Sequence, residues 1–299
     1  MKKNILLMAA LLGAVLLAGC QRAEEDLKDE KPQEPAAEGT FFLTLEASKG
    51  ADTKALYLDT SGSNDKLDAY WKSTEKVRVY KEGSYIGQLD VTPGAGDRPL
   101  TATLSGEITV SGLSSGDALM LLIPRESWDY TGQVGTLADI ESKYDYATAS
   151  VTVATISGNS VTANQSADFL NQQSVYRFGF KAGTDAVSVK SFTVSSANDA
   201  LVRTCSLDGT ATESGSITVT PASATSDLIY AALRNTRAGS SQDDSYSFSV
   251  IASDNSLYLG GKEIPATSLG AQGKFISAKT VEVSQARLTA SSTSTSEVW

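Results

Sequence analysis

From Thr40 onward, apolar and polar residues alternate with a period of two, and no long stripe with the period of an α-helix occurs. The clearest alternations cover residues 40–47, 77–80, 100–104, 174–180 and 246–252. Turn residues interrupt the pattern roughly every 8–12 residues, which predicts about seven or eight short strands in each half of the chain. Only residues 134–144 have a pattern that a short helix could use. The sequence therefore predicts an all-β protein built of sandwiches or barrels.

The patterning is weakest at residues 164–168, between the two sets of predicted strands. We place a domain boundary near residue 170. The prediction is two β-sandwich domains in series, one over residues 40–169 and one over residues 170–299, the second ending in a Ser/Thr-rich tail.

The first residues have the features of a bacterial export signal. Met1-Lys2-Lys3 is a short positive segment, and the apolar run 5–18 that follows is too short for a stable transmembrane helix. The run ends in Leu17-Ala18-Gly19-Cys20, which resembles the bacterial lipobox, where the Cys is acylated and the chain is cleaved before it. We expect residues 1–19 to be a lipoprotein signal peptide and Cys20 to carry the lipid that anchors the protein to a membrane.

Residues 20–39 are predicted to be a disordered acidic tether. The segment after Cys20 reads QRAEEDLKDEKPQEPAAEG and contains too few apolar side chains to offset the entropy lost on ordering. Its cluster Glu24-Glu25-Asp26 resembles the signal that sends lipoproteins of Bacteroidetes to the outer face of the outer membrane. A plain solvated linker is the alternative interpretation.

The composition excludes several kinds of function. The chain has no histidine, which removes Ser-His and Cys-His nucleophilic sites and His-ligated zinc. Its formal net charge of −10 argues against nucleic acid as a partner. With Cys20 acylated, Cys205 has no partner for an intrachain disulfide and is interpreted as a small buried residue. No motif points to a cofactor, a metal ion or a catalytic residue, so we expect a protein that is not an enzyme.

Two other functions stay open at this point. Trp128 and Tyr130 follow Pro124 in a predicted loop, and we expect them to be an exposed pair that could stack on sugars. They motivate the alternative of a glycan-binding surface lipoprotein of a polysaccharide-uptake system. A secreted hydrolase is the second alternative, because the spacing of two catalytic carboxylates is spatial and cannot be read from one sequence.

Two segments carry a resemblance to a known family. Residues 71–80, WKSTEKVRVY, fit the pattern W-x-x-x-D/E-x-I/V-x-V-Y/F, and residues 171–180, NQQSVYRFGF, open the second half. Together with the lipobox, the acidic tether and the first strand, they resemble the fimbrillin-like lipoproteins of Bacteroidetes. The resemblance implies two transthyretin-like β-sandwich domains and a structural or accessory role in a type V pilus at the outer membrane, with an adhesive role toward a host or bacterial surface ligand left open.

The resemblance also implies strand exchange between subunits. In polymerising members of the family, a trypsin-like protease removes the first strand after a basic residue, and an extended segment of the next subunit fills the groove. Here Lys49 or Lys54 would be the processing site, and Phe41, Leu43 and Leu45 would be the apolar plug of the first strand. The donor segment would lie within residues 279–299.

Overall fold

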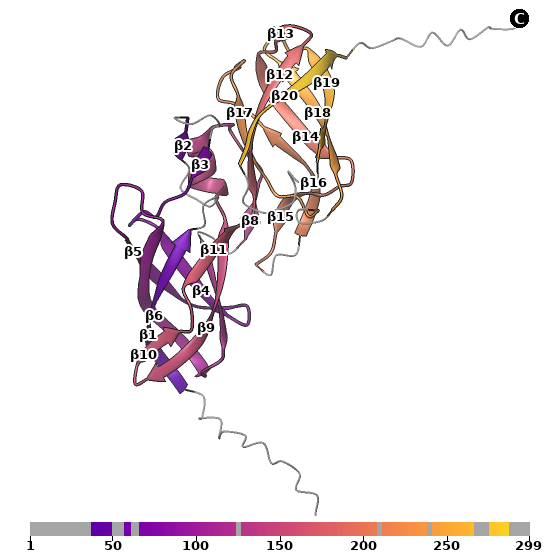
Figure 1. Ribbon diagram of the computed structural model, residues 1–299. Helices are drawn as coiled ribbons and strands as arrows, with labels where there is room; N and C mark the ends of the chain where they lie inside the picture. Colours follow the sequence, from indigo (N-terminus) through magenta and orange to yellow (C-terminus); the bar gives the residue numbers. More distant parts are fainter. Residues whose placement is uncertain are drawn as a thin grey trace, which may run out of the picture. The chain divides into compact units, whose positions relative to one another are not determined.

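The computed structural model describes residues 37–49, 57–60, 66–123, 127–207, 211–237, 241–265 and 275–286. The expected signal peptide, most of the tether, Cys20 and Lys54 lie outside these residues. The described residues form an all-β protein with two main sheets, as the alternation predicts (Figure 1).

The first sheet is formed by strands from the N-terminal half of the chain. Its strands are β1 (Ala37–Lys49), β4 (Lys76–Lys81), β5 (Ser84–Pro93), β6 (Thr101–Leu113), β7 (Ala118–Ile123), β9 (Ala147–Ser157), β10 (Ser160–Ala163) and β11 (Ala167–Asn171). Their order is β10-β1-β11-β9-β7-β4-β5-β6, and β1 also pairs with β6. This last pairing closes the sheet into a barrel, because it joins β6, at one end of the order, to β1, the second strand from the other end. A separate small pair consists of β2 (Tyr57–Asp59) and β3 (Lys66–Asp68).

Two glycines allow the close approach of β5 and β6 that this closure requires. A Cβ atom at Gly87 would lie 2.4 Å from the carbonyl oxygen of Glu107, and one at Gly106 would lie 2.5 Å from that of Gln88. Neither position therefore accepts a side chain without a shift of the backbone. Glycine at such places is typical of a tight bend in a curled sheet.

The second sheet is formed mainly by the C-terminal half. Its strands are β12 (Ser174–Ala182), β13 (Asp185–Ala186), β14 (Val189–Ser196), β15 (Leu201–Cys205), β16 (Ala211–Val219), β17 (Ile229–Leu233), β18 (Asp244–Ala252), β19 (Leu257–Ile264), β20 (Phe275–Gln285) and β8 (Trp128–Asp129). Their order is β13-β12-β20-β19-β18-β14-β16-β15-β8, with β17 on β12. This sheet curls into a half-barrel. The expected helical segment is present as α1 (Leu137–Asp139) and the π-turn η1 (Ile140–Tyr144).

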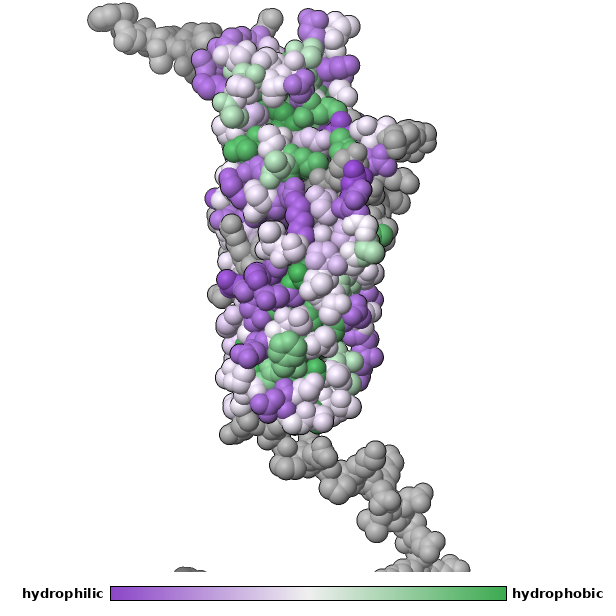
Figure 2. Space-filling model, turned by 90° about the vertical axis from the view of Figure 1, so that its left-hand side faces the viewer, coloured by the Kyte–Doolittle hydropathy of each residue, from purple (hydrophilic) through white to green (hydrophobic). Residues whose placement is uncertain are grey.

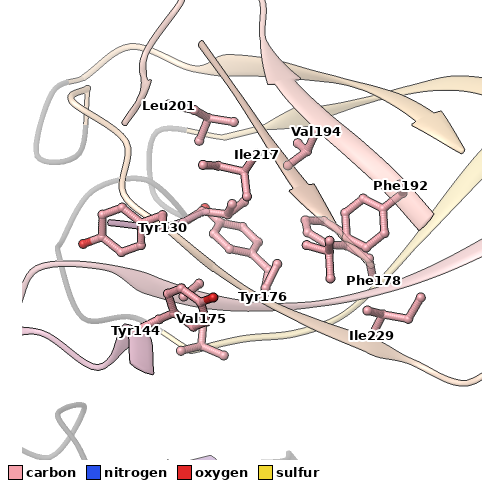
Figure 3. Packing of buried hydrophobic residues seen from close by; sticks show 14 of the residues in the cluster. Tyr130, Tyr144, Val175, Tyr176, Phe178, Phe192, Val194, Leu201, Ile217 and Ile229 are labelled. Atoms are coloured by element: carbon pink, nitrogen blue, oxygen red, sulfur yellow. The ribbon is translucent and has the colours of Figure 1, made fainter. Parts of the chain in front are cut away.

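Each sheet encloses its own core. The buried side chains of the first core all lie between residues 41 and 169, and Leu43, Val77 and Leu104 are among them. The second core is rich in aromatic rings, and Figure 3 shows Phe178 beside Phe192. The centroid of the Phe178 ring lies 5.7 Å from that of Phe192 and 5.0 Å from that of Phe248, in edge-on arrangements.

Residues 127–135, here called the inserted segment, belong to the second sheet although they follow β7 of the first. Asp129 and Trp128 of β8 pair with Thr204 and Cys205 of β15. Farther along, the side-chain amide of Gln133 bonds both main-chain groups of Ala232 in β17, accepting from the N–H at 2.7 Å and donating to the carbonyl at 2.8 Å. The inserted segment thus reaches from β15 to β17. The boundary proposed near residue 170 falls between β11 and β12, and this segment pairs across it.

A buried carboxylate ties together loops of the second sheet. Asp244 is 1% exposed. It accepts hydrogen bonds from Ser196 Oγ (2.7 Å), Asn198 Nδ2 (2.8 Å), Asn235 Nδ2 (2.7 Å) and the N–H of Ser245 (2.8 Å). Burial raises the pKa of the Asp244 carboxyl, but these hydrogen bonds outweigh burial, so its pKa lies below the ordinary value. The charged form is the one that the fold stabilises.

The Asp244 carboxylate should make the free energy of unfolding depend on pH in the acid range. Because its pKa is lowered in the folded state, its contribution is complete above the unfolded pKa of about 3.9 and is lost as pH falls through the folded value. We expect Asp244→Asn to lower the free energy of unfolding at pH 7 by about 2–3 kcal/mol and to flatten the fall of that free energy as the pH decreases below about 4. Urea unfolding at several pH values measures both effects. The exposed Asp227→Asn is the control, and equal curves for the two variants would contradict the assignment.

The inserted segment should be needed for the stability of the second sheet. Gln133→Ala leaves two buried main-chain groups of Ala232 without their partner, so we expect a loss of about 2–4 kcal/mol in the free energy of unfolding. Hydrogen exchange should accelerate at residues 229–233. Gln165→Ala, at an exposed Gln, serves as the matched control. Unchanged exchange at residues 229–233 would show that β17 does not depend on Gln133.

Candidate functional site

Strand β1 is hydrogen-bonded along both of its edges. On one edge it runs antiparallel to β6, from Ala37 opposite Leu113 to Ser48 opposite Thr101. On the other edge it runs parallel to β10 at residues 42–44 and to β11 at residues 47–49. Paired in this way, β1 closes the barrel and leaves little of its own main chain free.

The inward face of β1 carries the apolar side chains expected of a plug. Phe41, Leu43 and Leu45 are 4%, 0% and 6% exposed and belong to the first core. The residues between them are exposed, Phe42 at 50% among them. The period-two pattern therefore predicts correctly which face of β1 is buried. Whether these residues act as an exchangeable plug stays a prediction.

The inward face ends in a buried cation. Lys49 is 2% exposed, and its Nζ donates to the carbonyl oxygen of Tyr70 at 2.8 Å and to both carboxylate oxygens of Glu75 at 2.9 and 2.6 Å. Nζ also lies 4.1 Å from the centroid of the Trp71 ring. We call Tyr70, Trp71 and Glu75 the Lys49 cage. The three ammonium protons have three oxygen acceptors, which is the condition for burying a lysine.

The chain around the cage is held by its own hydrogen bonds. The N–H of Trp71 donates to the carbonyl of Pro99 at 2.8 Å, next to the point where the N–H of Lys49 donates to Leu100 at 2.9 Å. The N–H of Lys72 donates to the Glu75 carboxylate at 2.9 Å, which fixes that carboxylate in the turn before β4. The Trp and the Glu of the W-x-x-x-E pattern thus both contact the cation, beside the carbonyl of Tyr70. The pattern alone did not show that Lys49 is their partner.

Lys49 does not fit the role of a processing site in the folded chain. A trypsin-like protease must take the basic side chain into its own pocket, whereas Lys49 is buried and held by Glu75. The expectation for Lys49 is corrected on this ground. Lys54, the other expected site, lies outside the described residues.

Trp128 and Tyr130 are not an exposed pair. They are 2% and 0% exposed and belong to the second core, where Figure 3 shows Tyr130 in the same cluster as Tyr176 and Ile217. The expected loop is wrong because β8 pairs with β15 and Tyr130, directly after β8, donates its N–H to the carbonyl of Arg203 in β15 at 2.8 Å, so both rings are buried. The alternation of Trp128, Asp129 and Tyr130 is itself a strand pattern and was the signal for this. Neither ring can stack on a glycan.

The start of the expected donor segment is an internal strand. Residues 279–285 belong to β20, which pairs with β12 on one edge and β19 on the other. Residues 287–299 lie outside the described residues. A donor in this chain would therefore have to come from the part after β20.

Apolar and polar residues are mixed on the rest of the described surface, and the described residues contain neither a metal-binding group of side chains nor a membrane-spanning helix. On the face drawn in Figure 2, apolar patches are separated by polar side chains. Among the residues that the structure describes, no three His, Cys, Asp or Glu side chains are grouped so that they could hold a metal ion. Within the same ranges, no helix has the length and apolar character needed to cross a membrane.

The Lys49 cage should contribute strongly to stability. Lys49→Met keeps the length of the side chain and leaves the Glu75 carboxylate without its cation, so we expect the free energy of unfolding to fall by about 3 kcal/mol or more. Lys76→Met is the matched control, because Lys76 pairs with Asp90 on the surface and such pairs contribute at most about 1 kcal/mol. Thermal and urea unfolding measure both. Equal losses for the two variants would mean that the cage is energetically unimportant.

Comparisons with known proteins give similarity in structure alone, because no protein-family model and no curated protein matches the sequence. The chain is similar to a fimbrial assembly protein from Parabacteroides distasonis, with 11% identity, a TM-score of 0.35 and coverage of 84% of this chain and 100% of that one. It is similar to a Bacteroides ovatus protein provisionally described as an adhesin, with 11% identity, a TM-score of 0.41 and coverage of 84% and 93%. A second Bacteroides ovatus protein, provisionally described as a cell adhesion protein, has 12% identity, a TM-score of 0.38 and coverage of 82% and 95%.

TM-scores below 0.5 leave the function to be argued from the chain itself.

Proposed function

We propose that this protein is a non-enzymatic, surface-anchored subunit of a type V pilus, structural or accessory, whose first strand is exchanged for an extended segment of another subunit. The observation that carries the proposal is the position of β1. It closes the first sheet, it fills the core with alternate side chains, and it is the first strand of the described chain.

The position of β1 makes it separable from the rest of the sheet. No other strand precedes β1 in the described residues, so one cut after it frees the strand without interrupting another. Its removal would expose the edge of β6, the edges of β10 and β11, and the apolar core between them. Unpaired edges beside an apolar groove attract an extended strand, which supplies main-chain hydrogen bonds and alternate side chains.

The site of the cut is part of the proposal. Since Lys49 is buried in its cage, we assign processing to Lys54, and the whole of β1 would then leave the sheet. The lipid on Cys20 and the acidic tether would hold the unprocessed chain on the outer membrane. Its partners would be other pilus subunits and, in an adhesive role, a ligand on a host or bacterial surface.

The alternatives gain no support from the structure. The glycan-binding function depended on Trp128 and Tyr130, which are core residues. The hydrolase reading depended on carboxylates in a cleft, and the buried Asp244 is instead surrounded by hydrogen-bond donors.

Leu43 tests whether β1 is docked as a plug. Leu43→Asp places a charge at a fully buried position, and we expect it to lower the free energy of unfolding by at least about 3 kcal/mol. Thr44→Asp introduces the same charge one residue later, on the exposed side of β1, and should cost less than about 1 kcal/mol. Thermal unfolding of the unprocessed protein compares the two. A similar loss for both would contradict the docked plug.

Material sheared from cells tests the exchange itself. We expect a mature N-terminus directly after Lys54 and a ladder of oligomers that resist SDS without boiling. Lys54→Ala should abolish both, whereas Lys54→Arg should keep both, because a trypsin-like protease accepts either basic side chain. A protein that starts at acylated Cys20 and runs only as a monomer would rule out strand exchange and leave an anchor or a free-standing binder.

A further inference from the structure

We propose that the Lys49 cage is a cation-recognition site that selects which strand can replace β1. The incoming segment must place a Lys or Arg side chain between Glu75 and Trp71. The inference rests on the strand exchange proposed above and names the chemistry of the partner.

The first step concerns the side chains of the cage that would remain in the sheet after β1 had left it. The Glu75 side chain is 17% exposed in the folded chain, and Lys49 Nζ contacts both of its carboxylate oxygens. Without Lys49, this carboxylate would lose its counter-charge, and the Trp71 ring would lose the cation that lies over it. A poorly hydrated carboxylate without a cation is costly, so a neutral side chain at this position would fit badly.

The second step is the fixed distance between the cage and the apolar groove. Lys49 lies opposite Phe169 of β11, two residues after Ala47, which is 1% exposed. The inward positions of β1 therefore read Phe, Leu, Leu, Ala and Lys in alternation. A replacement strand would need apolar side chains at the same four positions, the last of them small, and a basic residue at the fifth.

The third step is register. A shift of one residue would turn every inward side chain outward. A shift of two residues would keep apolar side chains in the groove but move the cation away from Glu75. The apolar positions alone would allow this two-residue shift, whereas the Lys49 cage makes it unfavourable because Glu75 would lose its cation. The cage therefore fixes register as well as partner.

The fourth step concerns the tail of this chain. After β20 the sequence has one basic residue, Arg287, and the four alternate positions that would have to fill the groove before it, 279, 281, 283 and 285, belong to β20 itself. Residues 288–299 contain neither Lys nor Arg. The tail therefore does not offer a cation behind four free inward positions, so the segment that fills this groove comes from a chain of different sequence. Arg is an acceptable substitute for Lys in such a segment, because its guanidinium can bond a carboxylate and stack on an indole.

Strand replacement in the full chain tests this inference. A recognition sequence for a specific protease is placed in residues 50–56 and cut, so that β1 stays bound without a covalent link. Fluorescent peptides of residues 37–49 are then added in mild urea, and their binding is followed by anisotropy. The set comprises the natural peptide, Lys49→Met, Lys49→Arg and, as a control that removes a charge on the exposed face, Glu46→Gln. Each is tested on the natural chain and on the Glu75→Gln variant.

We expect the Lys49→Met peptide to bind at least about 30-fold more weakly than the natural peptide, with Lys49→Arg and Glu46→Gln within about tenfold of it. On the Glu75→Gln chain, the difference between Lys and Met should shrink to about threefold or less. If the natural and Met peptides bind equally, cation recognition is wrong while strand exchange stands. If not even the natural peptide binds, strand exchange itself is overturned, and this inference with it.

Discussion

The hydrogen bonding of β1 along both edges is the constraint on which the first half of the structure depends. With β1 in place, β6 on one side and β10 and β11 on the other have partners, and the sheet is a barrel. Without it, the same strands would form an open sheet whose core is exposed along a groove. One strand thus decides both whether the core is sealed and whether the sheet has edges that another chain can use.

The second sheet is also completed by one segment that supplies both core side chains and main-chain pairing, but this segment cannot be released. The inserted segment reaches from β15 to β17 and, like β1, supplies buried aromatic or apolar side chains together with main-chain pairing. However, it is joined to the first sheet at both ends, through β7 and through the helical turn α1. A single cut cannot release it. This difference in connectivity explains why we assign strand exchange to the first sheet and a fixed structural role to the inserted segment.

The sequence could predict what depends on local alternation, and little that depends on distant pairing. The inward direction of Phe41, Leu43 and Leu45 follows from period two, and so does the all-β class. The same period places Lys49 inward, but a lysine suggests exposure unless its partner is known, and Glu75 is 26 residues away. The prediction that Trp128 and Tyr130 form an exposed pair was wrong for a similar reason. Their alternation is that of a strand, yet β15, the strand they pair with, lies in the other half of the chain.

The buried Lys49 also shows why stability alone does not explain the cage. Replacing a buried ion pair by apolar side chains of similar volume is often neutral or stabilising, so a groove lined only with apolar residues would hold β1 at least as firmly. Such a groove would accept any alternating apolar strand in more than one register. By our inference, a carboxylate held by the main-chain N–H of Lys72, together with the Trp71 ring that contacts the same cation, accepts only a strand with a cation at that one position. Under the proposed strand exchange, that selectivity would decide which subunit follows which.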